Sequence, residues 1–119
     1  MNITKASMNI TKTSRELTNK EQYLLAKAQN VQKMQNAVGS TLECAYWCLY
    51  TDTTVDGEEK ELFSVMTPEG EAYATNSPSF IRSFYDILDC FEPGEIHSIK
   101  VDQGTSKAGR KYLFCVYVD

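Results

Sequence analysis

The sequence lacks the features of a membrane protein and of the common enzyme families. No stretch approaches the ~18 consecutive apolar residues that a membrane-spanning helix needs, and the first twenty residues are polar, without the apolar core of a signal peptide. P-loop, Gly-x-Gly-x-x-Gly and Gly-x-Ser-x-Gly motifs are absent. The single histidine, His97, has no partner at a spacing typical of a catalytic triad. We therefore expect a cytoplasmic binding protein with no enzymatic activity.

Cysteine pairs with metal-binding spacing are also missing. The four cysteines include no Cys-x-x-Cys motif, which is typical of reduced, packed thiols in an intracellular protein. An acidic stretch over residues 52–61 resembles a cation loop at first sight. However, Thr54 and Phe63 stand where an EF-hand needs ligands, and five carboxylates beside one loop repel each other. We expect neither a metal nor another cofactor.

Charge is unevenly distributed along the 119 residues. The chain as a whole has a net charge of −4. Residues 1–37 carry six basic residues against two acidic ones, a net charge of +4, whereas residues 38–119 carry six basic residues against fourteen acidic ones, a net charge of −8. This distribution excludes a globally basic nucleic-acid binder, but it leaves room for a local basic site.

The beginning of the chain contains a near-duplicate. Residues 8–14 repeat residues 1–7 at six of seven positions, and we expect a flexible tail over residues 1–17. Thr18 and Glu21 then have the spacing of a helix capping box. Apolar residues recur at helical spacing from Leu24 to Val38, which predicts an N-terminal helix over residues 18–38 within a single domain of residues 18–119.

The remainder of the domain shows a mostly β pattern. Strands are predicted at 41–50, 61–67 and 71–75, and further strands at 96–101 and 110–118. Between the two groups, Ser77 and Pro78 open an amphipathic helix that ends before Pro93. The order β-β-β-α-β-β predicts an α+β, mostly β fold. It is the order of an OB-like, five-stranded, partly open barrel.

A short basic segment is the strongest candidate for a binding site. Lys107, Arg110 and Lys111 place three cations within five residues, in the predicted loop between the last two strands, and Tyr112 follows them. In an OB-fold this loop frames the ligand groove, where cations pair with phosphates and an aromatic ring stacks on a base. The same residues are alternatively explained as a solubilising hairpin tip.

Aromatic residues of the first three strands are candidates for the rest of such a site. In the predicted strand 41–50, Trp47 shares a face with Glu43, which indicates contact with water. Phe63 and Tyr73 on neighbouring strands extend this face into a base-stacking platform. Each of the three rings is alternatively part of the hydrophobic core.

Three short segments carry a resemblance: residues 47–50 (WCLY), 70–77 (GEAYATNS) and 104–110 (GTSKAGR). They resemble small proteins of Gram-positive phages, plasmids and conjugative elements that are described as single-stranded-DNA-binding or replication-associated, and the resemblance spans residues 18–119. It implies sequence-tolerant binding to single-stranded DNA during replication or transfer of a mobile element. It also implies that Lys107 and Arg110 contact phosphates.

The sequence favours two functions, and a third, a small metal-dependent nuclease, rests on the acidic stretch of residues 52–61 alone. The first is a non-enzymatic single-stranded-DNA-binding protein, whose affinity falls steeply with salt. The second is a protein-binding adaptor, or an inhibitor of a host nucleic-acid enzyme, that uses the acidic surface to meet a basic partner. In either case a replication or host protein is a candidate partner, and the strand edges and the N-terminal helix are candidate oligomerisation surfaces.

Overall fold

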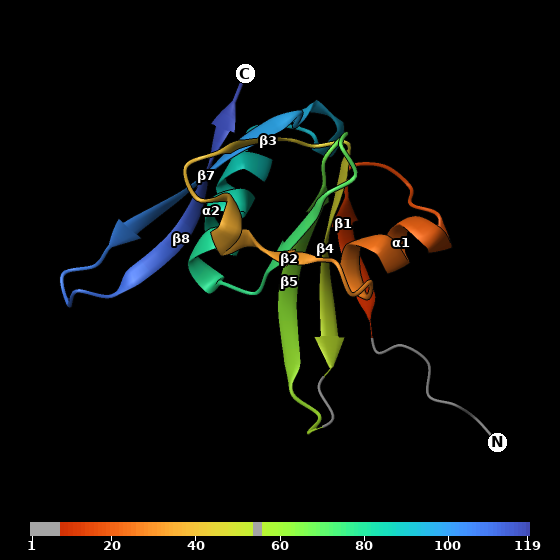
Figure 1. The fold of residues 1–119 in the computed structure, drawn as a ribbon, viewed down its shortest axis with the longest axis horizontal. Helices are drawn as coiled ribbons and strands as arrows, with labels where there is room; N and C mark the ends of the chain where they lie inside the picture. The colour runs from red at the N-terminus through yellow and green to blue at the C-terminus, as the bar shows by residue number, and fades with distance from the viewer. Residues whose placement is uncertain (1–7, 54–55) are drawn as a thin grey trace.

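The computed structural model describes residues 8–53 and 56–119. Within these two ranges, two α-helices and two short 3-10 helices accompany eight strands, and Figure 1 shows their arrangement. In chain order the elements are β1 (Asn9–Thr13), α1 (Asn19–Ala26), β2 (Gln32–Lys33), η1 (Met34–Ala37), β3 (Thr41–Glu43), β4 (Tyr46–Thr53), β5 (Glu59–Met66), β6 (Ala72–Thr75), α2 (Pro78–Leu88), η2 (Pro93–Glu95), β7 (Ser98–Thr105) and β8 (Lys111–Val118). No helix within the described residues is long and apolar enough to cross a membrane.

The strands form two open sheets. The large sheet has the order β1-β4-β5-β6-β2 and the small sheet the order β3-β7-β8. All neighbours are antiparallel except β2 and β6, which are parallel. The fold is therefore a mixed α+β structure, mostly strands, and its open sheets are compatible with a partly open barrel.

The predicted strand 41–50 is in fact two strands in different sheets. The chain changes partners at two consecutive residues: the Cys44 N–H donates to the His97 carbonyl beside the small sheet, and the Ala45 N–H donates to the Met66 carbonyl in the large sheet. β3 then pairs with β7, and β4 pairs with β5. The alternation across residues 41–50 consequently does not describe one surface.

The N-terminal helix begins where predicted but ends much earlier. The capping box is present, because the Thr18 side chain accepts from the Glu21 N–H and the Glu21 carboxylate accepts from the Thr18 N–H. The prediction of a helix over 18–38 is wrong beyond Ala26. Leu25 packs on one face of the large sheet, whereas Met34 is buried on the opposite face, so the chain must cross the sheet edge through β2.

The predicted flexible tail is also wrong over its described part. Residues 9–13 form β1, which pairs with β4 at the edge of the large sheet. Ser14 continues this attachment, because its N–H donates to the Trp47 carbonyl and its hydroxyl accepts from the Trp47 N–H. Leu17 is buried beside Leu25. Residues 1–7, the other part of the predicted tail, lie outside the described residues.

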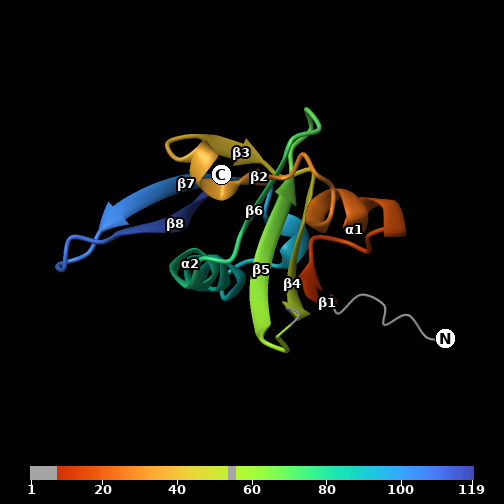
Figure 2. The same cartoon turned by 60° about the horizontal axis from the view of Figure 1, so that its bottom comes forward.

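The predicted start of helix α2 at Ser77 and Pro78 is confirmed. The helix lies between the two sheets (Figures 1 and 2). Its Ser77 side chain caps the Phe80 N–H, and Pro78 occupies the first turn. Two serines attach the helix to the free edge of β8. The Ser79 hydroxyl donates to the Leu113 carbonyl at 2.7 Å, and the Cys115 N–H donates to the Ser83 hydroxyl at 2.9 Å.

The position of α2 explains why the sheets do not close into a barrel. A closed five-stranded barrel would need β6 to pair with β8, but serine side chains of α2 occupy backbone groups of that edge. The structure therefore does not confirm the OB-fold predicted from the element order. The core instead forms around the helix, where four large aromatic rings meet. These are Trp47, Phe63, Phe80 and Phe84, all fully buried.

Candidate nucleic-acid interface

The structure corrects the predicted stacking platform on the first three strands. Trp47 and Phe63 are fully buried in the main core, where Trp47 lies 4.7 Å from Phe84 between ring centroids. Tyr73 is buried as well, and its hydroxyl donates to Glu71. These rings are core residues, and none offers a face to a nucleic acid.

The prediction of a stacking platform is wrong because the chain changes from one sheet to the other after Cys44. Glu43 is exposed on β3, but it belongs to the small sheet, so its exposure says nothing about Trp47 on β4. Both faces of the large sheet are covered, one by α2 and the other by α1. One consequence is that the Trp47 indole N–H is buried without an acceptor among the described residues.

The predicted basic segment forms the tip of the β7–β8 hairpin, which extends away from the rest of the molecule (Figures 1 and 2). The turn is closed by the Ser106 N–H donating to the Arg110 carbonyl at 2.8 Å, and Gly109 has a φ of 83° that favours glycine. Lys107, Arg110 and Lys111 are all exposed. Neither ion pair found in the described residues involves any of them.

An apolar strip adjoins this basic tip on the outer face of the small sheet. Tyr112 is 42% exposed and Val116 44% exposed, and Phe114 lies between them on the same side of β8. The Tyr112 and Phe114 rings are 5.9 Å apart between centroids. Sequence reasoning found Tyr112 but missed Phe114 and Val116. The alternation of residues 111–118 could have revealed them, because Leu113 and Cys115 pack inward.

Gly104 allows Tyr112 to lie flat across the hairpin. The two residues are cross-strand partners, and a Cβ atom at Gly104 would stand 2.5 Å from the Tyr112 Cζ atom. The missing side chain thus leaves space for the ring, which in turn covers the glycine backbone.

Gly104→Ala is expected to displace the Tyr112 ring while changing the free energy of unfolding by no more than about 0.5 kcal/mol, because both residues are near the surface and the end of the ring can move. Ring resonances of Tyr112 in NMR spectra measure the displacement, and chemical denaturation measures stability. Thr105→Ala provides the control on the neighbouring exposed position. Unchanged Tyr112 resonances would contradict this account of the glycine.

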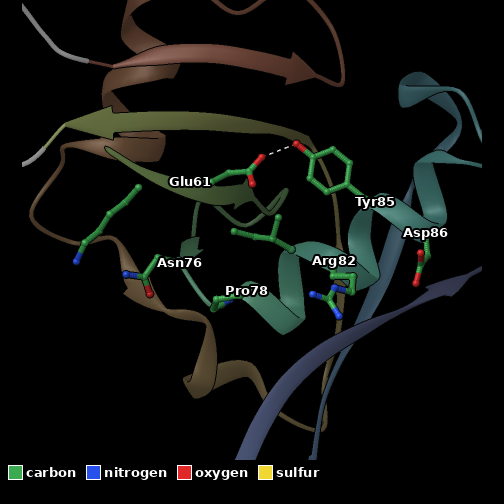
Figure 3. A pocket seen from close by; sticks show the side chains of 8 residues that line it. Glu61, Asn76, Pro78, Arg82, Tyr85 and Asp86 are labelled. Carbon is green, nitrogen blue, oxygen red and sulfur yellow. Dashed lines mark hydrogen bonds between the residues drawn. The ribbon is translucent and has the colours of Figure 1, made fainter. Parts of the chain in front are cut away.

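A concave pocket of about 700 Å³ lies between α2 and β5 (Figure 3). The Tyr85 hydroxyl donates to the Glu61 carboxylate across it. Burial, together with the charge and hydrogen bond of Glu61, raises the pKa of the Tyr85 phenol to about 12, so the phenol stays protonated at neutral pH. Lys60 and Arg82 also line this pocket, and both are exposed.

The basic residues of the acidic part of the chain belong to two regions, the β7–β8 hairpin and the pocket beside α2. Residues 38–119 contain six of them. Four belong to β7, β8 and their turn, and two line the pocket beside α2. They are Lys100, Lys107, Arg110 and Lys111 in the hairpin, and Lys60 and Arg82 in the pocket. A net charge of −8 over residues 38–119 therefore coexists with three cations at the hairpin tip and two in the pocket.

Comparisons with protein-family models, with curated proteins and with solved structures found no match to this chain.

Proposed function

We propose that this protein binds single-stranded DNA without sequence preference and without catalysis, through the outer face and tip of the β7–β8 hairpin. One observation carries the proposal: an exposed ring, Tyr112, stands directly beside three exposed cations in a domain that is otherwise acidic. Single-strand binders combine these two elements, since cations pair with the phosphates and aromatic faces stack on bases of any identity. Phe114 and Val116 extend the apolar surface along β8.

The strand pairing supports an OB-like plan as part of the same proposal. β3 and β4 together act as one bent strand that pairs with both β5 and β7, and α2 follows the third strand, β6. The β7–β8 turn then corresponds to a loop that frames the ligand in OB-folds. Action during replication or transfer of a phage or mobile element rests on the resemblance of residues 47–50, 70–77 and 104–110 alone, and action in the cytoplasm rests on the cysteine pattern of the sequence.

The basic tip is tested by the salt dependence of binding. We expect a labelled oligo-thymidine of about 30 nucleotides, longer than typical single-strand site sizes, to bind with an affinity that falls as salt rises. The slope of log affinity against log salt is negative, and each lost phosphate contact reduces its magnitude by about 0.7 for single strands. Lys107→Ala/Arg110→Ala should therefore reduce the slope by about 1.4, as measured by fluorescence anisotropy.

Lys12→Ala/Lys20→Ala is the matched control, because it removes two exposed cations from β1 and α1. It should leave the slope nearly unchanged. If the unaltered protein leaves the anisotropy flat even at low salt, the proposed function is wrong. The acidic surface and a basic protein partner then become the hypothesis to test.

Tyr112→Ala is expected to weaken binding of the same oligonucleotide about 5- to 150-fold, because stacking of one base on an aromatic ring contributes about 1–3 kcal/mol. Tyr23→Ala is the control, since Tyr23 is the other well-exposed tyrosine, 56% accessible on α1. Equal effects of the two substitutions would show that Tyr112 has no special part in binding.

A further inference from the structure

We propose that the bound strand continues from the hairpin through a groove around the first turn of α2 and ends in the pocket between α2 and β5. This inference rests on the proposed function, and it adds the path of the strand and a second set of contacts. It also gives a role to Lys60 and Arg82, which the hairpin surface does not use.

The groove consists of three cavities that share lining residues. A cavity of about 390 Å³ lies beside Lys111 and Tyr112, a second of about 400 Å³ lies beside Lys33, and the third is the 700 Å³ pocket of Lys60 and Arg82. The first and second cavities share Gln35, Ser77 and Leu113. The second and third share Asn76, and the first and third share Pro78. The cavities are therefore neighbours around the start of α2.

The groove exists because the two sheets do not close. β6 and β8 would meet here in a closed barrel, but α2 lies against the edge of β8 through Ser79 and Ser83. Ser77, the N-cap of the helix, lines the two cavities beside β8. Figure 2 shows α2 beside β5 and β8. The three cavities follow one another around this end of the helix, from the cavity beside Lys111 to the pocket of Lys60 and Arg82.

Cations accompany the whole length of this opening. Lys111 lines the first cavity, Lys33 the second, and Lys60 and Arg82 the third. All four side chains are exposed, and neither ion pair found in the described residues includes them. Such spacing of positive charge suits a ligand with repeated negative charges, and a phosphodiester chain is that ligand.

The lining also suits nucleotides in other respects. Apolar surface is provided by Ile81 and Pro78 in the last pocket, and Asn76 adds an amide at the junction with the second cavity (Figure 3). The carboxylates of the last pocket are Glu61 and Asp86, and Glu61 accepts the hydrogen bond of the Tyr85 hydroxyl. An apolar floor with a few polar groups is the usual composition of a site that holds a base.

The experiment compares oligo-thymidines of increasing length, from about 4 to about 30 nucleotides, a range that spans the site sizes of single-strand binders. Binding to the unaltered protein and to Lys60→Ala/Arg82→Ala is followed by anisotropy of the labelled strand. We expect the shortest strand to bind both proteins equally, because the hairpin suffices. For the longest strand, the variant should lose affinity and the salt slope should fall by about 1.4.

Lys12→Ala/Lys20→Ala controls for the general loss of two positive charges, and circular dichroism confirms that each variant is folded. The groove is overturned if Lys60→Ala/Arg82→Ala binds every length like the unaltered protein while Lys107→Ala/Arg110→Ala weakens binding. It is likewise overturned if the charge control reduces the slope for long strands by the same amount. Absence of binding by the unaltered protein at low salt overturns the proposed function itself, and the groove with it.

Discussion

Replacement of Phe84 by alanine is expected to lower the free energy of unfolding by about 3–5 kcal/mol. The side chain is fully buried in α2, and its ring lies 4.7 Å from that of Trp47 and 4.4 Å from that of Phe63, measured between centroids. Alanine favours the helix at least as well as phenylalanine, so the loss comes from the cavity and not from helix propensity. Urea denaturation followed by circular dichroism measures the change.

Asp86→Ala is the control on the same helix, because Asp86 is exposed two residues away. It should change the free energy of unfolding by no more than about 0.5 kcal/mol. A cost below about 1 kcal/mol for Phe84→Ala would contradict the central position of α2 between the sheets.

Leu25→Ala is expected to lower the free energy of unfolding by about 2–5 kcal/mol. Helix α1 has eight residues, too few to be stable alone in water, and Leu25 is its fully buried contact with the large sheet. Thermal and urea unfolding should both register the loss. Amide hydrogen exchange should show faster opening over residues 9–26, because Leu17 and α1 cover one face of the sheet and Ile10 of the edge strand β1 packs against the same cluster.

The matched control is Tyr23→Ala, which removes an exposed side chain from the same helix and should have little effect on stability. If Leu25→Ala were as mild as Tyr23→Ala, residues 8–26 would be a loosely attached extension.

Features encoded by neighbouring residues were predictable from the sequence. The capping box at Thr18 and the start of α2 at Ser77 were both predicted and are both present, because each cap is satisfied within three residues along the chain. The β7–β8 hairpin was predicted for a similar reason. Its turn is closed by contacts between Ser106 and Arg110.

Elements whose ends depend on distant partners were not predictable in the same way. The apolar spacing from Leu24 to Val38 is consistent with one helix, but Leu25 and Met34 pack in different clusters on opposite faces of the large sheet. The run at 41–50 likewise carries no local signal for the change of sheet. His97 and Met66, which receive the two hydrogen bonds at that point, are far away in the sequence.

One part of the candidate site was likewise predictable from neighbouring residues, and the other part depended on distant ones. Lys107, Arg110 and Lys111 are sequence neighbours, and their common location on one tip follows from that alone. The exclusion of Trp47 and Phe63 from the surface depends on α2, which is formed by residues 78–88 and covers both rings. A pattern of alternation records that a strand has two faces, but it does not record what covers each face.

Local propensity, charge distribution and turn chemistry were thus encoded in short stretches of sequence, because hydrogen bonds and side-chain periodicity act over a few residues. The tertiary structure alone decided which faces became core, and it alone brought Lys33, Lys60, Arg82 and Lys111 to one opening. Along the sequence, those four residues span most of the domain, from Lys33 to Lys111. Their proximity arises because burial of α2 between the sheets holds β6 and β8 apart.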